Sequence, residues 1–418
     1  MKIAYLMQVG VPDIRYDPPS GPALHVKHVV EELRRLGHHV SLLAFLEKGV
    51  WKSNDLRNFS PVAIPAIDSG ILKLAERSIR RLQYELQLPY AALFESLRFA
   101  LACCQELRGY DLFYERLGWV GYGAGLAAHW LHIPLILEVN GDHLSEMELQ
   151  GEAPQGCQRM LSMMLMKNAA HRAAHTVTTG EGWRKLYIER WKVDPASVTV
   201  IENGSELVKL IDRSRLRTFS PNSVSNNILT IAYSGGFDPW QGVTILLHAV
   251  CRVIATGIAV RLLLIGAGPG LAPAKQLAHD LGIEHQVVFT GQLASNEYAA
   301  YLTTADIGVS PYCGRAEYSG LKLLDYKAAG LAIIASGKEG QPAIIEHGRT
   351  GLIVPPCDED ALYEAIIHLN SNRDFAARLG KEARLEAERL HSWENTAKHL
   401  IELFTLVTGK YDGNRRVD

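Results

Sequence analysis

Two carboxylates, Glu317 and Asp325, stand on either side of a short turn of small residues. A predicted strand over 305–311 precedes the turn, and a predicted helix follows it and ends at Gly330. Because a helix N-terminus presents free N–H groups and a partial positive charge, it suits an anionic ligand such as a diphosphate. We therefore expect both carboxylates to face a crevice at the carboxyl end of the strand. Acidic residues near a helix N-terminus also stabilise the helix dipole, so a purely structural role is the alternative.

The elements that must position these carboxylates alternate between strands and helices. Short apolar runs are separated by Gly-rich loops and helical patterns, which is typical of βαβ units. The expected strands lie at 3–7, 40–45, 112–114, 134–139, 176–179 and 198–201 in a first series, and at 228–233, 260–265, 287–289, 306–309, 332–335 and 351–354 in a second. Continuous apolar strands indicate parallel sheets covered on both faces. The sequence therefore predicts an α/β fold with two doubly wound, Rossmann-like domains facing across a cleft.

The length of 418 residues exceeds what one hydrophobic core usually serves, which agrees with two domains. We place the first domain at 1–205 and the second at 228–390. Between them, at 206–227, periodicity is lost and Ser, Arg and Asn accumulate, which is typical of a linker. A net charge of −2 excludes a general attraction to nucleic acid or to an anionic membrane.

Cysteine usage and hydropathy indicate a cytoplasmic protein. No apolar run reaches the length of a transmembrane helix, and the first residues lack the features of a signal peptide. The cysteines show neither C-x-x-C spacing nor a cluster typical of a metal site. We therefore expect reduced thiols at all six, which are Cys103, Cys104, Cys157, Cys251, Cys313 and Cys357.

The acid-x7-acid spacing, with Gly320 and Leu321 between the acids, resembles an element of the retaining glycosyltransferases of family 4, which have the GT-B fold. Other segments resemble this family in the family's own order. They are the Gly-rich loop at 233–242, a V-G-x-G-P-like segment at 265–270, an F-x-G-x-V/L-like segment at 290–293 and a closing helix at about 391–418 that would cross back onto the first domain. The resemblance therefore spans nearly the whole chain.

The resemblance implies that the second domain binds a nucleotide diphosphate sugar. Glu317 would contact hydroxyl groups of the sugar, and Asp325, which replaces the usual Glu, would accept hydrogen bonds from the ribose hydroxyls. The other residues implied for the donor site are Gly235, Gly236, Gln241, Gly266, Gln292, Leu293, Arg315, Ser319, Gly320 and Leu321. A glycine after a strand is also common turn chemistry, so each glycine motif taken alone has a structural alternative.

The Gly-rich loop departs from the family pattern at two positions. Most members have Arg and Lys where this chain has Gly236 and Gln241, and those cations grip the diphosphate of the donor. Lys322, at the start of the predicted helix, and Arg315, on the same loop, are the basic residues that could replace them. The alternative for either residue is an ordinary solvated surface charge.

The first domain contains the residues implied for the acceptor, Gly21, His25 and Asp142. Many family members have a His at the position of Asn140, where it contacts the donor sugar, and His143 follows on the same loop. We therefore include Asn140 and His143, with Glu317 and Lys322, among the catalytic candidates. His25 could equally pack a helix, and His143 could be a polar surface residue.

A helical stretch over 71–107 carries Arg77, Arg80 and Arg81. Some relatives use basic helices of this domain to sit on membranes and reach lipid acceptors. Because Glu76 and Glu85 dilute the charge here, a solvated helix face is the preferred interpretation, and peripheral membrane contact is the alternative.

The resemblance implies a hexosyltransferase-type, metal-independent enzyme without a cofactor. It would move a sugar from a nucleotide sugar, with a UDP-sugar expected, to a hydroxyl of a glycan, lipid or small-molecule acceptor. The loss of both basic residues from the Gly-rich loop favours an alternative, a degenerate homologue that binds a ligand or partner without turnover. A third reading, a sugar phosphorylase or epimerase of the same fold, lacks its own catalytic residues in this sequence.

Overall fold

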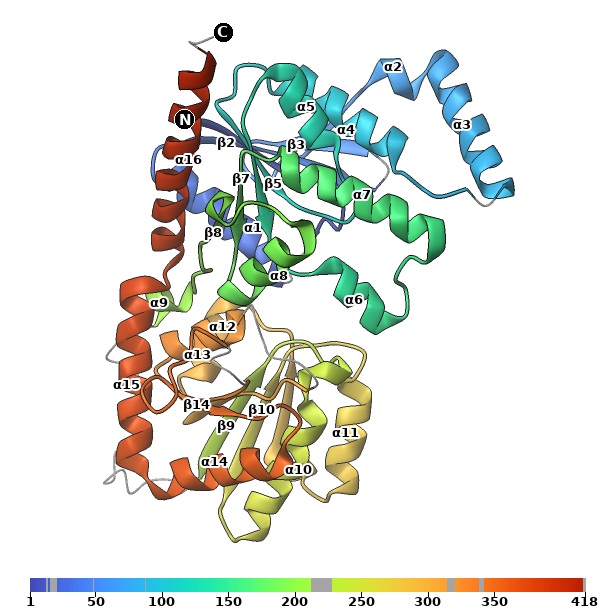
Figure 1. The fold of residues 1–418 in the computed structure, drawn as a ribbon. Coiled ribbons are helices and arrows are strands. Elements are labelled where there is room, and N and C mark those ends of the chain that lie inside the picture. The colour runs from blue at the N-terminus through green and yellow to red at the C-terminus, as the bar shows by residue number, and fades with distance from the viewer. Residues whose placement is uncertain are drawn as a thin grey trace. The chain divides into compact units, whose positions relative to one another are not determined.

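The chain folds as two units, each built on one sheet with helices packed against it (Figure 1). The first unit comprises Met1–Glu202 and Ala397–Asp418, and the second comprises Asn203–Thr396. The computed structural model describes all residues except 13, 16–20, 48, 87, 212–227, 314–319, 338–341 and 416–418. Both sheets are mainly parallel, which confirms the predicted α/β class with two Rossmann-like sheets.

The sheet of the first unit has the strand order β4-β3-β2-β1-β5-β6-β7-β8. Its strands are β1 (Lys2–Met7), β2 (His39–Leu46), β3 (Gly49–Ser53), β4 (Ser60–Val62), β5 (Leu112–Arg116), β6 (Leu135–Val139), β7 (His175–Thr178) and β8 (Val198–Val200). Strands β3 and β4 extend the parallel sheet in antiparallel fashion. The strand order reverses between β1 and β5, so the carboxyl ends of these two strands border the position where doubly wound sheets bind ligands.

The helices of the first unit connect the parallel strands. They are α1 (Gly21–Arg35), α2 (Pro65–Asp68), α3 (Gly70–Glu85), α4 (Leu93–Glu106), α5 (Gly123–Leu131), α6 (His143–Gln150), α7 (Gly156–Arg172), α8 (Glu181–Trp191) and the short 3-10 turn η1 (Pro195–Ser197). The last helix, α16 (Trp393–Arg415), packs on this unit from Ala397 onward, where the Phe404 ring lies 5.1 Å from that of Tyr114.

The single helical stretch predicted over 71–107 is wrong in one respect, because it consists of the two helices α3 and α4. Pro89 lies between them and cannot donate a backbone hydrogen bond, and Ala92 adopts a left-handed conformation with φ of 49°. On α3 the arginines are paired, since Arg80 bonds to Glu76 and Arg81 bonds to Glu85. This pairing agrees with the solvated-face interpretation for the charged side of α3.

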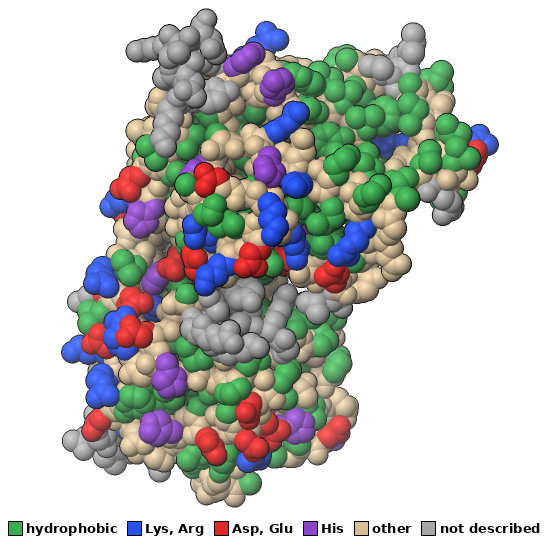
Figure 2. All heavy atoms as spheres, in the orientation of Figure 1, with side chains coloured by type: hydrophobic (Ala, Val, Ile, Leu, Met, Phe, Trp, Pro, Cys, Tyr) green, Lys and Arg blue, Asp and Glu red, His purple; other side chains and the backbone are tan. Residues whose placement is uncertain are grey.

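Exposed apolar side chains concentrate around α3 and α7. They are Leu74, Ile79, Leu82, Tyr84, Leu86, Leu88, Tyr90, Leu93, Met160 and Met164. Figure 2 shows hydrophobic side chains gathered on the face in view, over the part of the first unit where Figure 1 labels α4 and α7. Within the described residues, no helix combines the length and the hydropathy needed to cross a bilayer.

The sheet of the second unit has the order β11-β10-β9-β12-β13-β14, and all of its pairs are parallel. Its strands are β9 (Leu229–Ser234), β10 (Val260–Ile265), β11 (Val287–Gly291), β12 (Ile307–Ser310), β13 (Ala332–Ser336) and β14 (Leu352–Val354). Renumbered along the unit, this is the order 3-2-1-4-5-6 of dinucleotide-binding sheets. The carboxyl ends of β9 and β12 therefore border the ligand position of this sheet.

The helices of the second unit cover both faces of its sheet. They are α9 (Leu207–Leu210), α10 (Val243–Ala255), α11 (Leu271–Asp280), α12 (Ser295–Leu302), α13 (Leu321–Ala328), α14 (Glu359–Ser371), α15 (Arg373–Leu390) and the 3-10 turns η3 (Pro239–Gln241) and η4 (Glu284–Gln286). Alternate residues of one strand enter different cores: Ile231 packs in the cluster with α10 and α14, whereas Ala232 packs in the cluster with α13 and α15. This two-sided burial explains why the strands are continuously apolar.

Two sequence expectations differ from the structure in this unit. Helix α9 occupies the beginning of the expected linker over 206–227, and Leu207 is fully buried, whereas 212–227 lie outside the described residues. The expectation that all cysteines are reduced is wrong, because Cys313 and Cys357 form a disulfide with 4.6 Å between their Cα atoms. The two cysteines are 44 residues apart, but they follow β12 and β14, which flank β13, so the sheet brings them together.

Candidate active site

Glycines shape the loop that follows β9. A Cβ atom at Gly266, where φ is +132°, would lie 2.0 Å from the carbonyl oxygen of Gly235, and one at Gly242 would lie 1.7 Å from that of Pro311. The Gly235 N–H also donates to the carbonyl of Ile265 across 3.0 Å. The loops after β9, β10 and β12 therefore pack backbone against backbone, which only glycine permits at these positions.

Lys322 lies against this loop, at the beginning of α13. Its Nζ donates a hydrogen bond to Oε1 of Gln241 across 2.6 Å, and it sits 4.8 Å and 5.0 Å from the ring centroids of Tyr233 and Tyr312. A Cβ atom added to Gly235 would be only 3.1 Å from the Lys322 Nζ. The structure thus places an ammonium group beside the Gly-rich loop and at a helix N-terminus. An anion bound there would contact the ammonium group, the loop and the N-terminus of the helix.

Asp325, one turn further along α13, is held by two hydroxyl groups. Ser205 Oγ donates to Oδ1 across 2.6 Å, and Tyr298 OH donates to Oδ2 across 3.1 Å. Burial raises the pKa of Asp325 to about 7, because loss of hydration outweighs the two hydrogen bonds, and nearby Glu206 adds to the rise. Near neutral pH this carboxyl group is therefore poised between its protonated and ionised forms.

Tyrosine hydroxyls that sequence reasoning missed connect Asp325 to the end of β9. The Ser234 N–H donates to Tyr326 OH across 2.7 Å, and Ser234 Oγ lies 2.8 Å from Tyr298 OH. The Tyr326 ring fits there because Gly308 has no side chain, since a Cβ atom at Gly308 would lie 2.6 Å from the ring. The sequence signal is faint: Tyr326 lies in the predicted helix that ends at Gly330, and both tyrosines resemble ordinary core residues.

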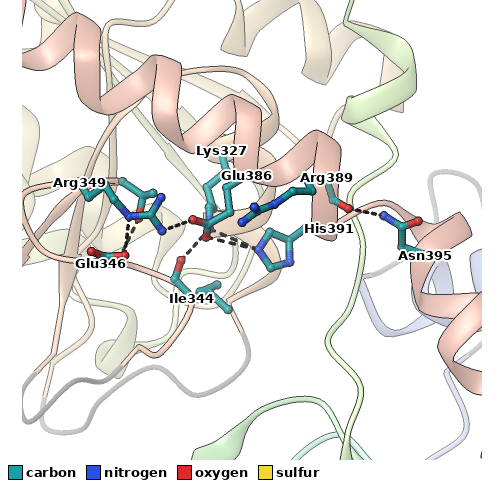
Figure 3. A network of polar contacts seen from close by, with 9 residues as sticks. Lys327, Ile344, Glu346, Arg349, Glu386, Arg389, His391 and Asn395 are labelled. Atoms are coloured by element: carbon teal, nitrogen blue, oxygen red, sulfur yellow. Dashed lines mark hydrogen bonds and ion pairs between the residues drawn. The ribbon is translucent and has the colours of Figure 1, made fainter.

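A buried ion network holds the other side of α13 (Figure 3). Lys327, fully buried, donates to the Ile344 carbonyl across 2.7 Å, pairs with Glu386 of α15 and lies 3.3 Å from His391 Nε2. Arg349 binds the second oxygen of Glu386 across 2.5 Å. Hydrogen bonds from His391 and Lys327 keep the pKa of Glu386 well below its usual range, so its carboxylate stays ionised. The network fixes the orientation of the helix that carries Lys322 and Asp325.

Some of the remaining donor candidates lie in the described part of the chain, and the others lie outside it. Gln292, which is exposed, and Leu293, which is half-buried, follow β11, and the Gly291 carbonyl accepts a 2.9 Å hydrogen bond from the Gly266 N–H. Gly236 lies on the loop after β9, Gly320 directly precedes α13, and Leu321 is the first residue of α13, next to Lys322. The candidates outside the described residues are Glu317, Arg315 and Ser319.

In the first unit, His25 takes part in a buried triad. Its Nε2 pairs with Oε1 of Glu138, whose Oε2 accepts a 2.6 Å hydrogen bond from Tyr5 OH, and both partners are at most 4% exposed. Burial acts to raise the pKa of Glu138, but the charge and hydrogen bond of His25 outweigh it and lower the value to about 2. His25 therefore serves the interior of this unit, which favours the packing interpretation. Gly21 begins α1 beside it and is exposed.

Asp142 and His143 lie where α6 begins. Asp142 pairs with Arg190 of α8 and accepts a hydrogen bond from Ser145, so its carboxylate is engaged within the unit. Burial lowers the pKa of His143, and the positive charge of Arg116 lowers it further, so the imidazole is neutral at neutral pH. Both residues line a small cavity of about 30 Å³ together with Arg190.

Arg116 is a charged residue of this region that sequence reasoning missed. It is the last residue of β5, next to Met7 of β1 and Glu138 of β6 in the strand register. Its Nη1, like Nδ2 of the predicted Asn140, is buried and has no hydrogen-bond partner within the part of the chain that the structure describes. A charged residue at the end of an apolar strand is the signal that could have identified it.

Among the described residues, no three His, Cys, Asp or Glu side chains gather in a way that could hold a metal ion. What the geometry does bring together is a glycine-lined loop, a helix N-terminus, an ammonium group and a carboxyl group in the second unit. Such a set can bind a diphosphate and a neighbouring polyol.

Two family models match the chain, one in each half. A glycosyl transferase 4-like domain matches residues 20–204, and glycosyl transferases group 1 match residues 228–372. Both matches agree with the family suggested by the acid-x7-acid element, and this prediction is confirmed.

Characterised relatives are similar at moderate identity. A GDP-mannose-dependent alpha-(1-6)-phosphatidylinositol monomannoside mannosyltransferase of Mycobacterium tuberculosis is 30% identical over 169 residues, which cover 39% of this chain and 44% of the relative. The chain thus spans less than half the length of that relative. A phosphatidyl-myo-inositol mannosyltransferase of Mycolicibacterium smegmatis is 25% identical over 406 residues, 94% of this chain and 92% of the relative.

Solved structures share the fold. Anabaena HepE in complex with UDP has a TM-score of 0.69 at 17% identity, and the match covers 97% of this chain and 100% of the HepE chain. Sucrose-phosphate synthase from Thermosynechococcus elongatus has a TM-score of 0.69 at 21% identity, and the match covers 98% of this chain and 100% of the synthase chain. These similarities establish the GT-B architecture.

Proposed function

Because the chain belongs to the glycosyl transferases group 1, the family 4 type of GT-B glycosyltransferase, we propose that it transfers a sugar from a nucleoside diphosphate sugar to an acceptor hydroxyl with retention of configuration. The observation that carries the proposal is the contact of Lys322 with Gln241 and the Gly235 loop. Lys322 supplies a cation to a loop in which this chain lacks both cations of the family pattern.

The proposed chemistry depends on stabilising the leaving group. As the bond between the anomeric carbon and the diphosphate breaks, negative charge grows on the departing oxygen. The Lys322 ammonium, the N–H groups at the N-terminus of α13 and the Gly-rich loop would stabilise that charge. The acceptor oxygen forms the new bond on the same face of the sugar, and its proton passes to the released diphosphate. No step in this scheme requires a metal ion.

Carboxylates have a positioning role in this proposal. Asp325 would accept hydrogen bonds from the ribose hydroxyls when it is ionised, and Glu317 would bind sugar hydroxyls. Asn140 and His143 would contact the donor sugar or the acceptor from the first unit. We propose a UDP-sugar as the donor, with HepE, which binds UDP, as the supporting comparison, while the mannosyltransferase relative is named for GDP-mannose. A cytoplasmic location and a glycan, lipid or small-molecule acceptor belong to the same proposal.

Thermal unfolding of the purified protein against UDP, GDP, ADP and their sugar conjugates tests the donor site. A nucleotide at a hundred times its dissociation constant should add about 2.7 kcal/mol to the free energy of unfolding. One base that gives a clear shift supports the proposal and identifies the nucleotide. Absence of any shift across the panel would contradict it.

A degenerate binding protein remains the second candidate, because Gly236 and Gln241 replace the two cations of the family loop. Release of nucleoside diphosphate from the donor that gives the shift separates the two functions. Turnover, followed with the anomeric configuration of the product by NMR, supports a retaining transferase. Binding without release of the diphosphate supports the degenerate protein.

A further inference from the structure

Two buried nitrogen donors at the carboxyl edge of the first sheet lack acceptors within the described part of the chain. Arg116 ends β5 and is in register with Glu138, and Asn140 is the first residue after β6. Nη1 of Arg116 and Nδ2 of Asn140 are both buried, and neither has a hydrogen-bond partner among the described residues. The edge where they meet lies beside the β1–β5 switch point, where doubly wound sheets bind their ligands.

The carboxylates near Arg116 are already engaged. Glu138 bonds through one oxygen to His25 and through the other to Tyr5, and Asp142 pairs with Arg190. Arg116 itself forms no ion pair with any residue that the structure describes, although its charge lowers the pKa of both Glu138 and His143. Its Nη1 therefore has a donor to spare among the residues that the structure describes.

The neighbouring amide of Gln8 is not available to complete the arrangement. Gln8 Nε2 donates to Ser96 Oγ across 2.8 Å, and its Oε1 accepts from the Gly123 N–H across 2.7 Å. The oxygen atoms that Arg116 and Asn140 need must therefore come from outside this cluster. A buried donor without an acceptor is destabilising, and a guanidinium donor more so than an amide, so such a pair is typical of a ligand site.

We propose that Arg116 and Asn140 bind a phosphate or carboxylate group of the acceptor, which makes the acceptor an anionic, hydroxyl-bearing molecule. The inference rests on the proposed transferase function and adds the chemical class of the acceptor to it. The planar guanidinium group matches two oxygens of either anion, and the Asn140 amide can donate to one of the same oxygens. A neutral imidazole at His143 leaves the positive charge of Arg116 as the main attraction.

Calorimetry with matched probes that differ in charge tests this assignment. The full chain is first saturated with the nucleoside diphosphate that gives the largest thermal shift. The probes are glucose, glucose 6-phosphate and glucuronate, and also glycerol and glycerol 3-phosphate. The wild-type protein should bind a charged probe about tenfold more tightly than its neutral partner, as expected for a charge-assisted hydrogen bond. Preference for the phosphates or for glucuronate tells which anion the site takes.

Three variants make the test specific to Arg116. Arg116→Gln should abolish the preference for charged probes. Arg116→Lys should retain part of it, because lysine keeps the positive charge but lacks the planar group that donates to two oxygens at once. Arg108→Gln is the control, because Arg108 is an exposed cation of the same unit whose guanidinium donates to the Cys104 carbonyl and, in the described ranges, to no other group. It should keep the full preference. Melting temperatures of the variants check that each one is folded.

Several results would overturn the inference. Equal binding of charged and neutral probes by the wild-type protein, or no binding of any probe, contradicts an anionic acceptor. An unchanged preference in Arg116→Gln removes Arg116 from the site, and weaker binding of the nucleoside diphosphate by that variant would assign Arg116 to the donor. The nucleotide-induced thermal shift of the wild-type protein separates these failures from failure of the proposed function.

Discussion

The Lys322 ammonium group donates a 2.6 Å hydrogen bond to the Gln241 side chain, which stands at one of the two positions where the Gly-rich loop lacks the usual cation. The two residues are 81 positions apart: Gln241 ends the turn η3 after β9, and Lys322 lies in the first turn of α13 after β12. The contact returns a positive charge to the loop from a different element. It also makes the role of Lys322 directly testable.

Lys322→Met should weaken binding of the nucleoside diphosphate roughly 10- to 100-fold, because a charge-assisted hydrogen bond to phosphate is lost while the packing volume is kept. Calorimetric titration with the nucleotide that gives the thermal shift measures the effect. Lys381→Met, at an exposed position of α15, is the matched control and should bind like the wild type. Unchanged affinity in Lys322→Met would exclude a phosphate contact.

Nucleotide affinity should rise as the pH increases from about 6 to about 8, because burial raises the pKa of Asp325 to about 7 and only the ionised carboxylate accepts from both ribose hydroxyls. Asp325→Asn should lose this dependence. The nucleotide phosphate titrates in the same range, so the informative quantity is the difference between wild type and variant at each pH. Parallel pH profiles would refute the ribose contact.

Stability should fall as the pH rises from about 4.5 to about 8, because burial raises the pKa of Glu115 from 4.5 to about 8. Between these pH values the folded chain keeps a proton on Glu115 that the unfolded chain has released. The stability that this proton gives is complete at low pH and is lost as the pH rises through the folded pKa of about 8. Glu115→Gln should lose less stability between pH 5 and pH 9 than the exposed control Glu152→Gln. Thermal melts at both pH values measure this, and identical losses would show that Glu115 ionises freely.

Gly266→Ala should destabilise the protein more than Gly257→Ala, and only the first should impair nucleotide binding. Both glycines have a positive φ, which costs an alanine about 1 kcal/mol, but the new Cβ atom meets Gly235 O at 2.0 Å in one case and open space in the other. Chemical denaturation and nucleotide titration of both variants check this. Equal losses of stability would mean that the loops do not pack as closely as described.

Alkylation of the denatured, unreduced protein should modify four thiols, and reduction should expose two more, because Cys313 and Cys357 are bonded to each other. Mass spectrometry of the intact chain counts them. Since the bond closes a loop of 44 residues, a reductant should lower the free energy of unfolding by about 2–4 kcal/mol. Six reactive thiols before reduction would show that the pair is not bonded.

Sequence reasoning succeeded where a pattern is local. Continuous apolar runs such as Ile3 to Met7 predicted parallel strands, because a strand buried on both faces must be apolar throughout. The glycines at 235 and 266 were placed in loops directly after strands, where the structure has them, and the predicted helix start places Lys322 in the first turn of α13. Reasoning failed for the interruption at Pro89, where helical periodicity on both sides concealed the break.

By itself the sequence determined the α/β class, the two Rossmann-like sheets and the family, because these depend on the order of strands, helices and glycine turns along the chain. The tertiary structure decided which distant side chains meet. It joined Lys322 to Gln241 and enclosed Asp325 between Ser205 and Tyr298. It also left Arg116 with a buried nitrogen that has no acceptor among the residues that the structure describes. The physical reason is that parallel strands deliver residues from remote positions to one sheet edge, where burial, hydrogen bonding and charge depend on spatial neighbours and not on sequence neighbours.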